Sequence, residues 1–150
     1  MGQLSALLDL ARQRAEQRSA PYAGEVTPQE AWTLLQSAPG TVLVDVRSHA
    51  EWQWVGRVPH SVEIEWASWP GMAHNDHFLV HMKKQVDPEA MVLFLCRSGV
   101  RSIAAAKLAT ENGWRNCYNI LEGFEGEKDA NGQRGHIGGW RKAGLPWTQS

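Results

Sequence analysis

Cys96 is the residue in this sequence that is best placed to do chemistry. It follows the apolar run at 91–95, and a strong helix-forming segment begins five residues after it. In parallel α/β sheets, ligands bind at the carboxyl ends of the strands. The backbone amides of a tight loop and of a helix start converge there and stabilise an anion. Although a free cysteine is usually a small buried apolar residue, this context predicts a nucleophilic thiolate at Cys96.

The loop after this cysteine carries the other candidate site residues, which are Arg97, Ser98, Gly99, Val100 and Arg101. Arg97 and Arg101 bring two positive charges, which favour a thiolate over a thiol. Gly99 allows a backbone shape that a residue with a Cβ resists. Tyrosine phosphatases place an arginine six positions after their cysteine, whereas Arg101 is five positions after Cys96. Since a shorter loop suits one sulfur better than a tetrahedral phosphate, a phosphatase or an arsenate reductase is the less favoured alternative.

Strands that alternate with helices must position this loop. We expect the strands at 41–47, 61–64, 91–95 and 116–121, and the helices at 28–38, 78–86 and 103–112. The stretches 66–76 and 122–139 are rich in turn residues, which is typical of loops. This order of elements predicts an α/β fold with a central, mostly parallel sheet flanked by helices.

An additional amphipathic helix is expected at the N-terminus. Leu4, Leu7, Leu8 and Ala11 recur at helical spacing, and the pattern ends near Arg18. We therefore divide the chain into an N-terminal helix or arm at 1–20 and a single domain at 21–150. We favour a helix that packs on the domain, or an undocked arm, over one that pairs with a second copy of the chain.

The composition excludes several classes of protein. The chain has 150 residues, of which 43% are apolar and 21% charged, and its net charge is −1, as is ordinary for a soluble globular protein. A protein held by nucleic-acid phosphates would carry a basic surplus, and no apolar run approaches the ~20 residues that span a bilayer. Two cysteines cannot form a disulfide framework, and the first residues lack a secretory signal. We therefore expect a cytoplasmic protein with neither a nucleic-acid nor a membrane partner.

Four segments in order resemble the rhodanese family of sulfurtransferases over about residues 22–147. They are LVDVRSHAEW at 43–52, the short strand after Val58-Pro59, CRSGVRS at 96–102 and NILEGFEG at 119–126. The terminal GGWRKAGLPW at 138–147 also resembles the end of many single-domain rhodaneses. The sequence departs from the family at 56–59, where Gly-Arg-Val-Pro replaces the usual glycine–histidine pair before an isoleucine–proline step. We expect this departure to change local packing and to have little effect on chemistry.

The resemblance implies a rhodanese-like fold and a persulfide on Cys96. A small anionic donor such as thiosulfate would give its outer sulfur to Cys96, which would pass it to cyanide, to a thiol or to a protein acceptor. Asp45 and Arg47 match the aspartate–arginine strand motif of the family, and we interpret this pair as structural. No cofactor is implied. A binding module that uses the same fold without catalysis is the second alternative.

Several other residues could have a function, but a simpler interpretation is favoured for each. His74, His77 and His81 have the spacing of one helix face, yet we expect a polar surface and no metal. Cys117 could be a resolving thiol, but its place in a strand predicts that it packs in the core.

The same choice applies to aromatic and loop residues near the presumed site. For Trp66 and Trp69 packing is favoured over a place at the active site. His136 could line the pocket mouth, although we do not favour this, and the segment 125–135 (EGEKDANGQRG) is expected to be a solvated loop.

Overall fold

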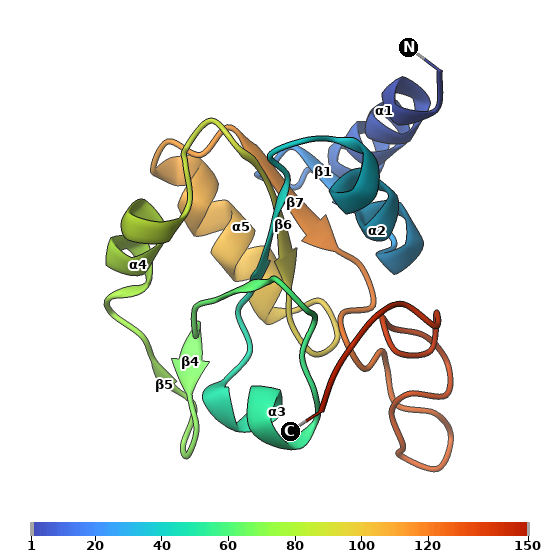
Figure 1. Ribbon diagram of the computed structural model, residues 1–150, viewed down its shortest axis with the longest axis vertical. Helices are drawn as coiled ribbons and strands as arrows, with labels where there is room; N and C mark the ends of the chain where they lie inside the picture. The colour runs from blue at the N-terminus through green and yellow to red at the C-terminus, as the bar shows by residue number, and fades with distance from the viewer. Residues whose placement is uncertain (1, 150) are drawn as a thin grey trace.

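A five-stranded parallel sheet forms the centre of the computed structural model, which describes residues 2–149 (Figure 1). Its strand order is β1-β7-β6-β2-β3, and each neighbouring pair is parallel. The strands are β1 (Gly24–Val26), β2 (Val42–Asp45), β3 (Val62–Glu63), β6 (Met91–Leu95) and β7 (Asn116–Ile120). The prediction of an α/β fold with a parallel sheet is confirmed.

Helices cover both faces of this sheet. They are α1 (Gly2–Gln17), α2 (Pro28–Ser37), α3 (His49–Trp54), α4 (Phe78–Gln85) and α5 (Arg101–Glu111). Figure 1 shows α4 and α5 on one face and α1 and α2 on the other. No helix in the described range 2–149 has the length and apolar character to cross a membrane.

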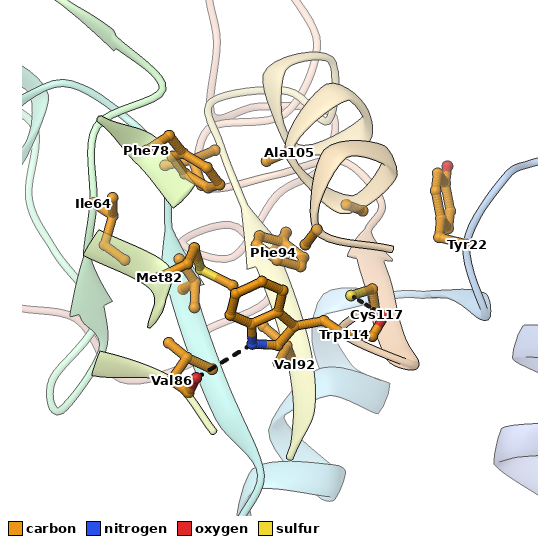
Figure 2. Close-up of a cluster of buried hydrophobic side chains, with 14 of the residues drawn as sticks. Tyr22, Ile64, Phe78, Met82, Val86, Val92, Phe94, Ala105, Trp114 and Cys117 are labelled. Atoms are coloured by element: carbon orange, nitrogen blue, oxygen red, sulfur yellow. Dashed lines mark hydrogen bonds between the residues drawn. The ribbon is translucent and has the colours of Figure 1, made fainter. Parts of the chain in front are cut away.

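Strand β6 divides the hydrophobic core in two, because successive side chains of a strand point to opposite faces. Val92, Phe94 and Cys96 belong to the cluster that packs under α4 and α5, which also contains Trp114 and Cys117 (Figure 2). The intervening residues of β6 belong to the cluster under α1 and α2. The alternation therefore directs the Cys96 side chain towards the face that α5 covers.

Helix α1 packs on the rest of the molecule, as favoured from the sequence. Ala11 and Ala15 are buried, and α1 contacts β1 and α2. The Arg14 guanidinium binds both carboxylate oxygens of Glu30 at 2.6 and 3.1 Å. Glu30 also closes the capping box of α2 with Thr27, so one carboxylate joins two helices.

The structure differs from the expectation in three places, two of them between β2 and α4. Helix α3 was not expected, although Ser48 and Glu51 form a capping box at its start. Residues 66–76, expected to be a loop, contain the antiparallel hairpin β4 (Ala67–Ser68) and β5 (Ala73–His74). Strand β1 was also missed, because it has only three residues and no alternation to recognise.

Candidate active site

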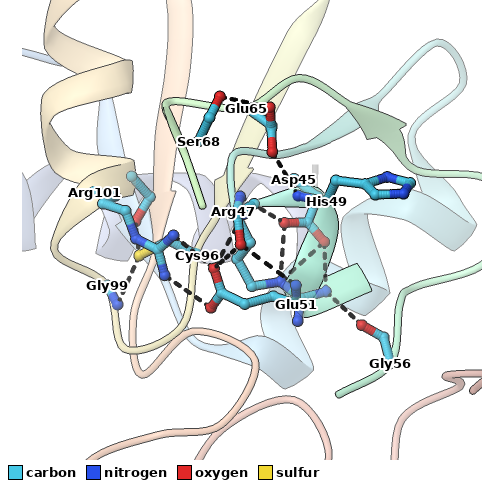
Figure 3. Close-up of polar contacts among 12 residues, drawn as sticks. Asp45, Arg47, His49, Glu51, Gly56, Glu65, Ser68, Cys96, Gly99 and Arg101 are labelled. Atoms are coloured by element: carbon cyan, nitrogen blue, oxygen red, sulfur yellow. Dashed lines mark hydrogen bonds and ion pairs between the residues drawn. The ribbon is translucent and has the colours of Figure 1, made fainter. Parts of the chain in front are cut away.

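Cys96 lies directly after β6, at the carboxyl edge of the parallel sheet (Figure 3). The residue is only 1% exposed. The backbone amide of Gly99 donates a hydrogen bond to Sγ at 3.1 Å, and the Ser102 hydroxyl is 3.3 Å from the same sulfur. A loop amide and a first-turn hydroxyl of α5 therefore contact the sulfur, and the amide is a donor that stabilises an anion there.

The residues of the loop after Cys96 differ in their exposure to solvent. Gly99 is buried and has a φ of +102°, a conformation that L side chains rarely adopt. Arg97 and Val100 are exposed, whereas Ser98 and Arg101 are half-buried. The glycine thus lets the chain turn tightly enough to direct its own amide at the sulfur, while its neighbours face solvent.

Arg101 forms a bidentate ion pair with Glu51, which Figure 3 shows beside Cys96. The two hydrogen bonds measure 2.7 and 2.9 Å. Burial acts to raise the pKa of Glu51, but the hydrogen bonds from Arg101 and from the Ser48 amide outweigh it and lower the pKa to about 2. Two free positive charges were expected at the loop. In the structure Glu51 balances the charge of Arg101, whereas Arg97 has no ion pair within residues 2–149.

A buried chain of polar groups extends from Cys96 in the other direction. The Ser102 hydroxyl donates to Oδ1 of Asn119 at 2.5 Å, and Nδ2 of Asn119 donates to Oε2 of Glu25 at 3.4 Å. The same Glu25 oxygen accepts from the Tyr22 hydroxyl at 2.7 Å and pairs with Arg18 at 3.1 Å. Ser102, Asn119 and Glu25 are each 1% exposed or less. A continuous polar path therefore joins the sulfur to the end of the N-terminal segment.

Sheet register explains why this chain forms. Glu25 on β1 is the direct partner of Asn119 on β7, and facing side chains of neighbouring strands lie close together. Ser102 is in the first turn of α5, which covers this face of the sheet. The chain therefore follows from three elements that are distant in sequence.

Asp45 and Arg47 form a fully buried ion pair of 2.7 Å. Arg47 also donates to the carbonyl oxygen of Gly56 at 2.8 Å, and its guanidinium lies 4.1 Å from the centre of the Phe124 ring. These contacts tie the end of β2 to the segment after α3 and to the C-terminal region. The geometry supports the structural interpretation of the pair.

Two pockets of similar volume flank the loop. The first, named the arginine pocket, has a volume of about 560 Å³ and is lined by Arg97, Arg101, Arg134, Glu51, Trp54 and Trp69, among others. The second, named the acidic pocket, has about 550 Å³ and is lined by Ser98, Gly99, Val100, Arg18, Glu122 and Glu127, among others. Arg97 and Arg134 have no ion pairs within residues 2–149, and neither do Glu122 and Glu127 in the acidic pocket. An anion is therefore favoured in the arginine pocket and disfavoured in the acidic one.

Trp66 and Trp69, the two tryptophans considered near the site, differ in whether they pack in the core. Trp66 packs at an edge-to-face distance of 5.0 Å from Phe78, as expected. The packing interpretation is wrong for Trp69, which is 64% exposed and lines the arginine pocket. It lies at the tip of the β4–β5 hairpin, where there is no core to receive it.

The remaining candidates lie away from the loop. His74 is in β5, His77 precedes α4 and His81 is inside α4, so the three do not share one helix face. Within residues 2–149 there is no group of three or more side chains arranged to hold a metal ion. His136 pairs with Asp129 at 2.7 Å, and it is the next two residues that line the acidic pocket.

Cys117 lies inside β7 and is fully buried (Figure 2). Its sulfur hydrogen bonds to the Trp114 carbonyl oxygen at 3.4 Å, and burial raises the pKa of this thiol to about 11. The expected place in the core is confirmed. The segment 125–135 is largely exposed, as expected, although Glu125, Glu127 and Arg134 reach the two pockets.

The structure is that of an α/β protein with a buried thiol at the end of a central parallel strand. The model of the rhodanese-like domain matches residues 27–130, so the chain belongs to the rhodanese-like family. It is 38% identical over 122 residues to an uncharacterized protein of Rickettsia conorii, a match that covers 79% of this chain and 91% of the relative. It is 30% identical over 104 residues to the thiosulfate sulfurtransferase GlpE of Haemophilus influenzae, covering 68% and 85%.

A solved structure supports the same assignment. A crystal structure of an M. tuberculosis protein has 48% sequence identity and a TM-score of 0.80, and the match covers 86% of this chain and 99% of that one. The fold expected from the resemblance is thus shown.

Proposed function

We propose that this protein transfers sulfane sulfur through a persulfide on Cys96. The observation that carries the proposal is the position of this sulfur at the end of β6, held by the Gly99 amide at 3.1 Å. The similarity to thiosulfate sulfurtransferases supports it.

The reaction has two half-reactions, which is the pattern of covalent catalysis. The Cys96 thiolate attacks the outer sulfur of thiosulfate, a new S–S bond forms, and the old S–S bond breaks with its electron pair on the departing sulfite. The terminal sulfur of the persulfide then bonds to the acceptor, cyanide or a thiol. Its bond to Sγ breaks, and the electron pair returns to the Cys96 thiolate. No external oxidant or reductant is needed.

The unpaired positive charge supports binding of the anionic donor in the arginine pocket. Arg97 and Arg134 face it without a carboxylate partner, while Glu51 holds Arg101 in place. A charge-assisted hydrogen bond from Arg97 would stabilise both the anionic donor and the departing sulfite. Ser98, Gly99 and Val100 complete the loop. In this proposal Arg101 keeps the loop attached to α3. The free thiols of Cys96 and Cys117 fit a reducing compartment such as the cytoplasm.

The test is turnover of thiosulfate and cyanide by the wild type and by Cys96→Ser, with circular dichroism to show that the variant is folded. Cys117→Ala provides the matched control, since it changes the other cysteine. We expect thiocyanate from the wild type and from Cys117→Ala but not from Cys96→Ser. Activity that persists in folded Cys96→Ser would refute the assignment.

Two further assays separate the alternatives. Hydrolysis of an aryl phosphate that depends on Cys96 would favour the phosphatase, for which the loop is one residue short. Absence of turnover with every donor, together with tight binding of a sulfur anion, would favour the non-catalytic module.

A further inference from the structure

The direction of the Ser102 hydroxyl is set at the far end of the buried polar chain. The Glu25 carboxylate accepts hydrogen bonds from Tyr22 and faces Arg18. Burial raises the pKa of Tyr22, as does its hydrogen bond to Glu25, so the phenol keeps its proton and donates it. The side of Glu25 that faces Asn119 therefore also acts as an acceptor.

This acceptor fixes the orientation of the Asn119 amide. Only the NH₂ group of an asparagine can donate, so Nδ2 faces Glu25 and Oδ1 faces Ser102. The reverse orientation would place a carbonyl oxygen against a carboxylate. Asn119 thus presents an acceptor to Ser102, and the Ser102 hydroxyl donates its single proton to it.

A hydroxyl whose proton is used in this way presents lone pairs to Cys96. At 3.3 Å from Sγ, the Ser102 oxygen can accept a hydrogen bond from a thiol but cannot donate one to a thiolate. To donate to a thiolate, the Ser102 hydroxyl would have to rotate its proton towards Sγ. Oδ1 of the buried Asn119 would then lose its donor. A persulfide places its negative charge on the outer sulfur, so its inner sulfur needs no donor from Ser102.

We propose that Glu25 and Asn119 are positioning residues that oppose negative charge on Sγ of Cys96. The Gly99 amide, which donates to Sγ, acts in the opposite sense. The remaining charged groups near the sulfur belong to balanced pairs, Arg101 with Glu51 and Arg47 with Asp45, apart from exposed Arg97. If the proposed function holds, this polar chain favours negative charge on the outer sulfur of the persulfide over negative charge on Sγ of Cys96. It thereby favours formation of the persulfide.

The opposite model makes an opposite prediction. If Ser102 donates to the thiolate, its removal raises the pH at which Cys96 becomes reactive. If Ser102 is held as an acceptor, its removal lowers this pH. The sign of the shift therefore separates the two models among folded variants, because loss of structure moves the midpoint towards that of a free cysteine.

The experiment measures the rate of alkylation by iodoacetamide against pH, which needs no sulfur transfer. Cys117→Ala serves as the background, so that Cys96 is the one remaining thiol of the sequence. In this background we compare Ser102→Ala, Asn119→Ala and Glu25→Gln, with exposed Glu16→Gln as the control. Thermal unfolding of each variant shows which are folded.

We expect the midpoint of the profile to move to lower pH in all three variants and to stay in place for Glu16→Gln. Asn119→Ala should give a larger shift than Ser102→Ala, because it frees the hydroxyl to donate to the thiolate. One such hydrogen bond corresponds to a shift of about one pH unit. A midpoint that rises in Ser102→Ala, or that is unchanged in folded Ser102→Ala and Glu25→Gln, would overturn the inference. Neither result bears on whether thiosulfate is turned over, so this test and that of the proposed function fail separately.

Discussion

The two sides of Cys96 are built from polar groups with opposite degrees of exposure. On one side Ser102, Asn119 and Glu25 are 1% exposed or less. On the other, Arg101 and Glu51 are half-buried and Arg97 is exposed beside the arginine pocket. The buried side faces the acidic pocket, where an anionic substrate is disfavoured, so we assign its groups to positioning the sulfur. The open side has unpaired positive charge, so it can bind an anion. The groups that position the sulfur thus lie on one side of Cys96, and the groups that can bind an anion lie on the other.

The largest effect on stability should come from the buried side. Glu25→Ala leaves Tyr22, Asn119 and Arg18 without their shared acceptor. Loss of a buried hydrogen-bonded charge should lower the free energy of unfolding by about 3 kcal/mol. Urea denaturation measures it, and Glu16→Ala on the exposed face of α1 is the control. A cost for Glu25→Ala no greater than that for Glu16→Ala would show that the buried chain contributes little to stability.

The ion pair between Arg101 and Glu51 on the open side should make the stability of the protein depend on pH. Because the pKa of Glu51 is lowered to about 2, its contribution is fully present above the unfolded value of about 4.3. It is lost as the pH falls from there towards 2. Glu51→Gln should therefore be less stable than the wild type at neutral pH, by about 3 kcal/mol at most.

The difference between Glu51→Gln and the wild type should shrink steadily as the pH falls through this window. Chemical denaturation at several pH values measures it. Glu89→Gln, which changes an exposed glutamate, provides the control. A stability difference that is constant between pH 4.5 and 2 would contradict the lowered pKa.

Removing the unpaired charge should affect one half-reaction more than the other. Arg97→Ala should lower kcat/KM for the thiosulfate half-reaction by about tenfold to a hundredfold, the value of a charge-assisted hydrogen bond. The step from persulfide to cyanide should suffer less, because it releases less negative charge. Stopped-flow measurement of each half-reaction separates them, and Lys128→Ala removes an exposed charge that lines neither pocket. Equal losses in both half-reactions would assign Arg97 a structural role.

The smallest effect should come from the buried thiol outside the polar chain. Cys117→Ala removes a sulfur from β7 without touching Ser102, Asn119 or Glu25, and should cost about 1 kcal/mol of stability. Turnover should remain nearly unchanged. A large loss of turnover, or a disulfide between Cys96 and Cys117 trapped after addition of donor, would show that Cys117 acts as a resolving thiol.

The parts of the molecule that the sequence predicts correctly depend on local patterns. The apolar run before Cys96 and the helix former after it place the strand, the loop and the start of α5 within a few residues. The capping box at Ser48 and Glu51 is also local, and it could have predicted α3.

The ion pair and the buried polar chain beside Cys96 join residues that are far apart in the sequence. Glu51 is 50 residues from Arg101, and Glu25 is 94 residues from Asn119. These pairs depend on strand order and register, which no local pattern encodes. The exposure of Trp69 depends similarly on a hairpin too short to have a strand pattern. The position of Cys96 at the end of a strand was therefore predictable, while the partners of the loop and of the polar chain were not.

The central claim is that Cys96 accepts a sulfur atom, and intact mass spectrometry tests it most directly. Wild type, Cys96→Ser and Cys117→Ala are each incubated with thiosulfate, measured, then treated with cyanide and measured again. The account predicts that the wild type and Cys117→Ala gain the mass of one sulfur atom and lose it to cyanide, whereas Cys96→Ser gains none. A gain in folded Cys96→Ser, or no gain in the wild type with thiosulfate or any other sulfane-sulfur donor, would contradict it.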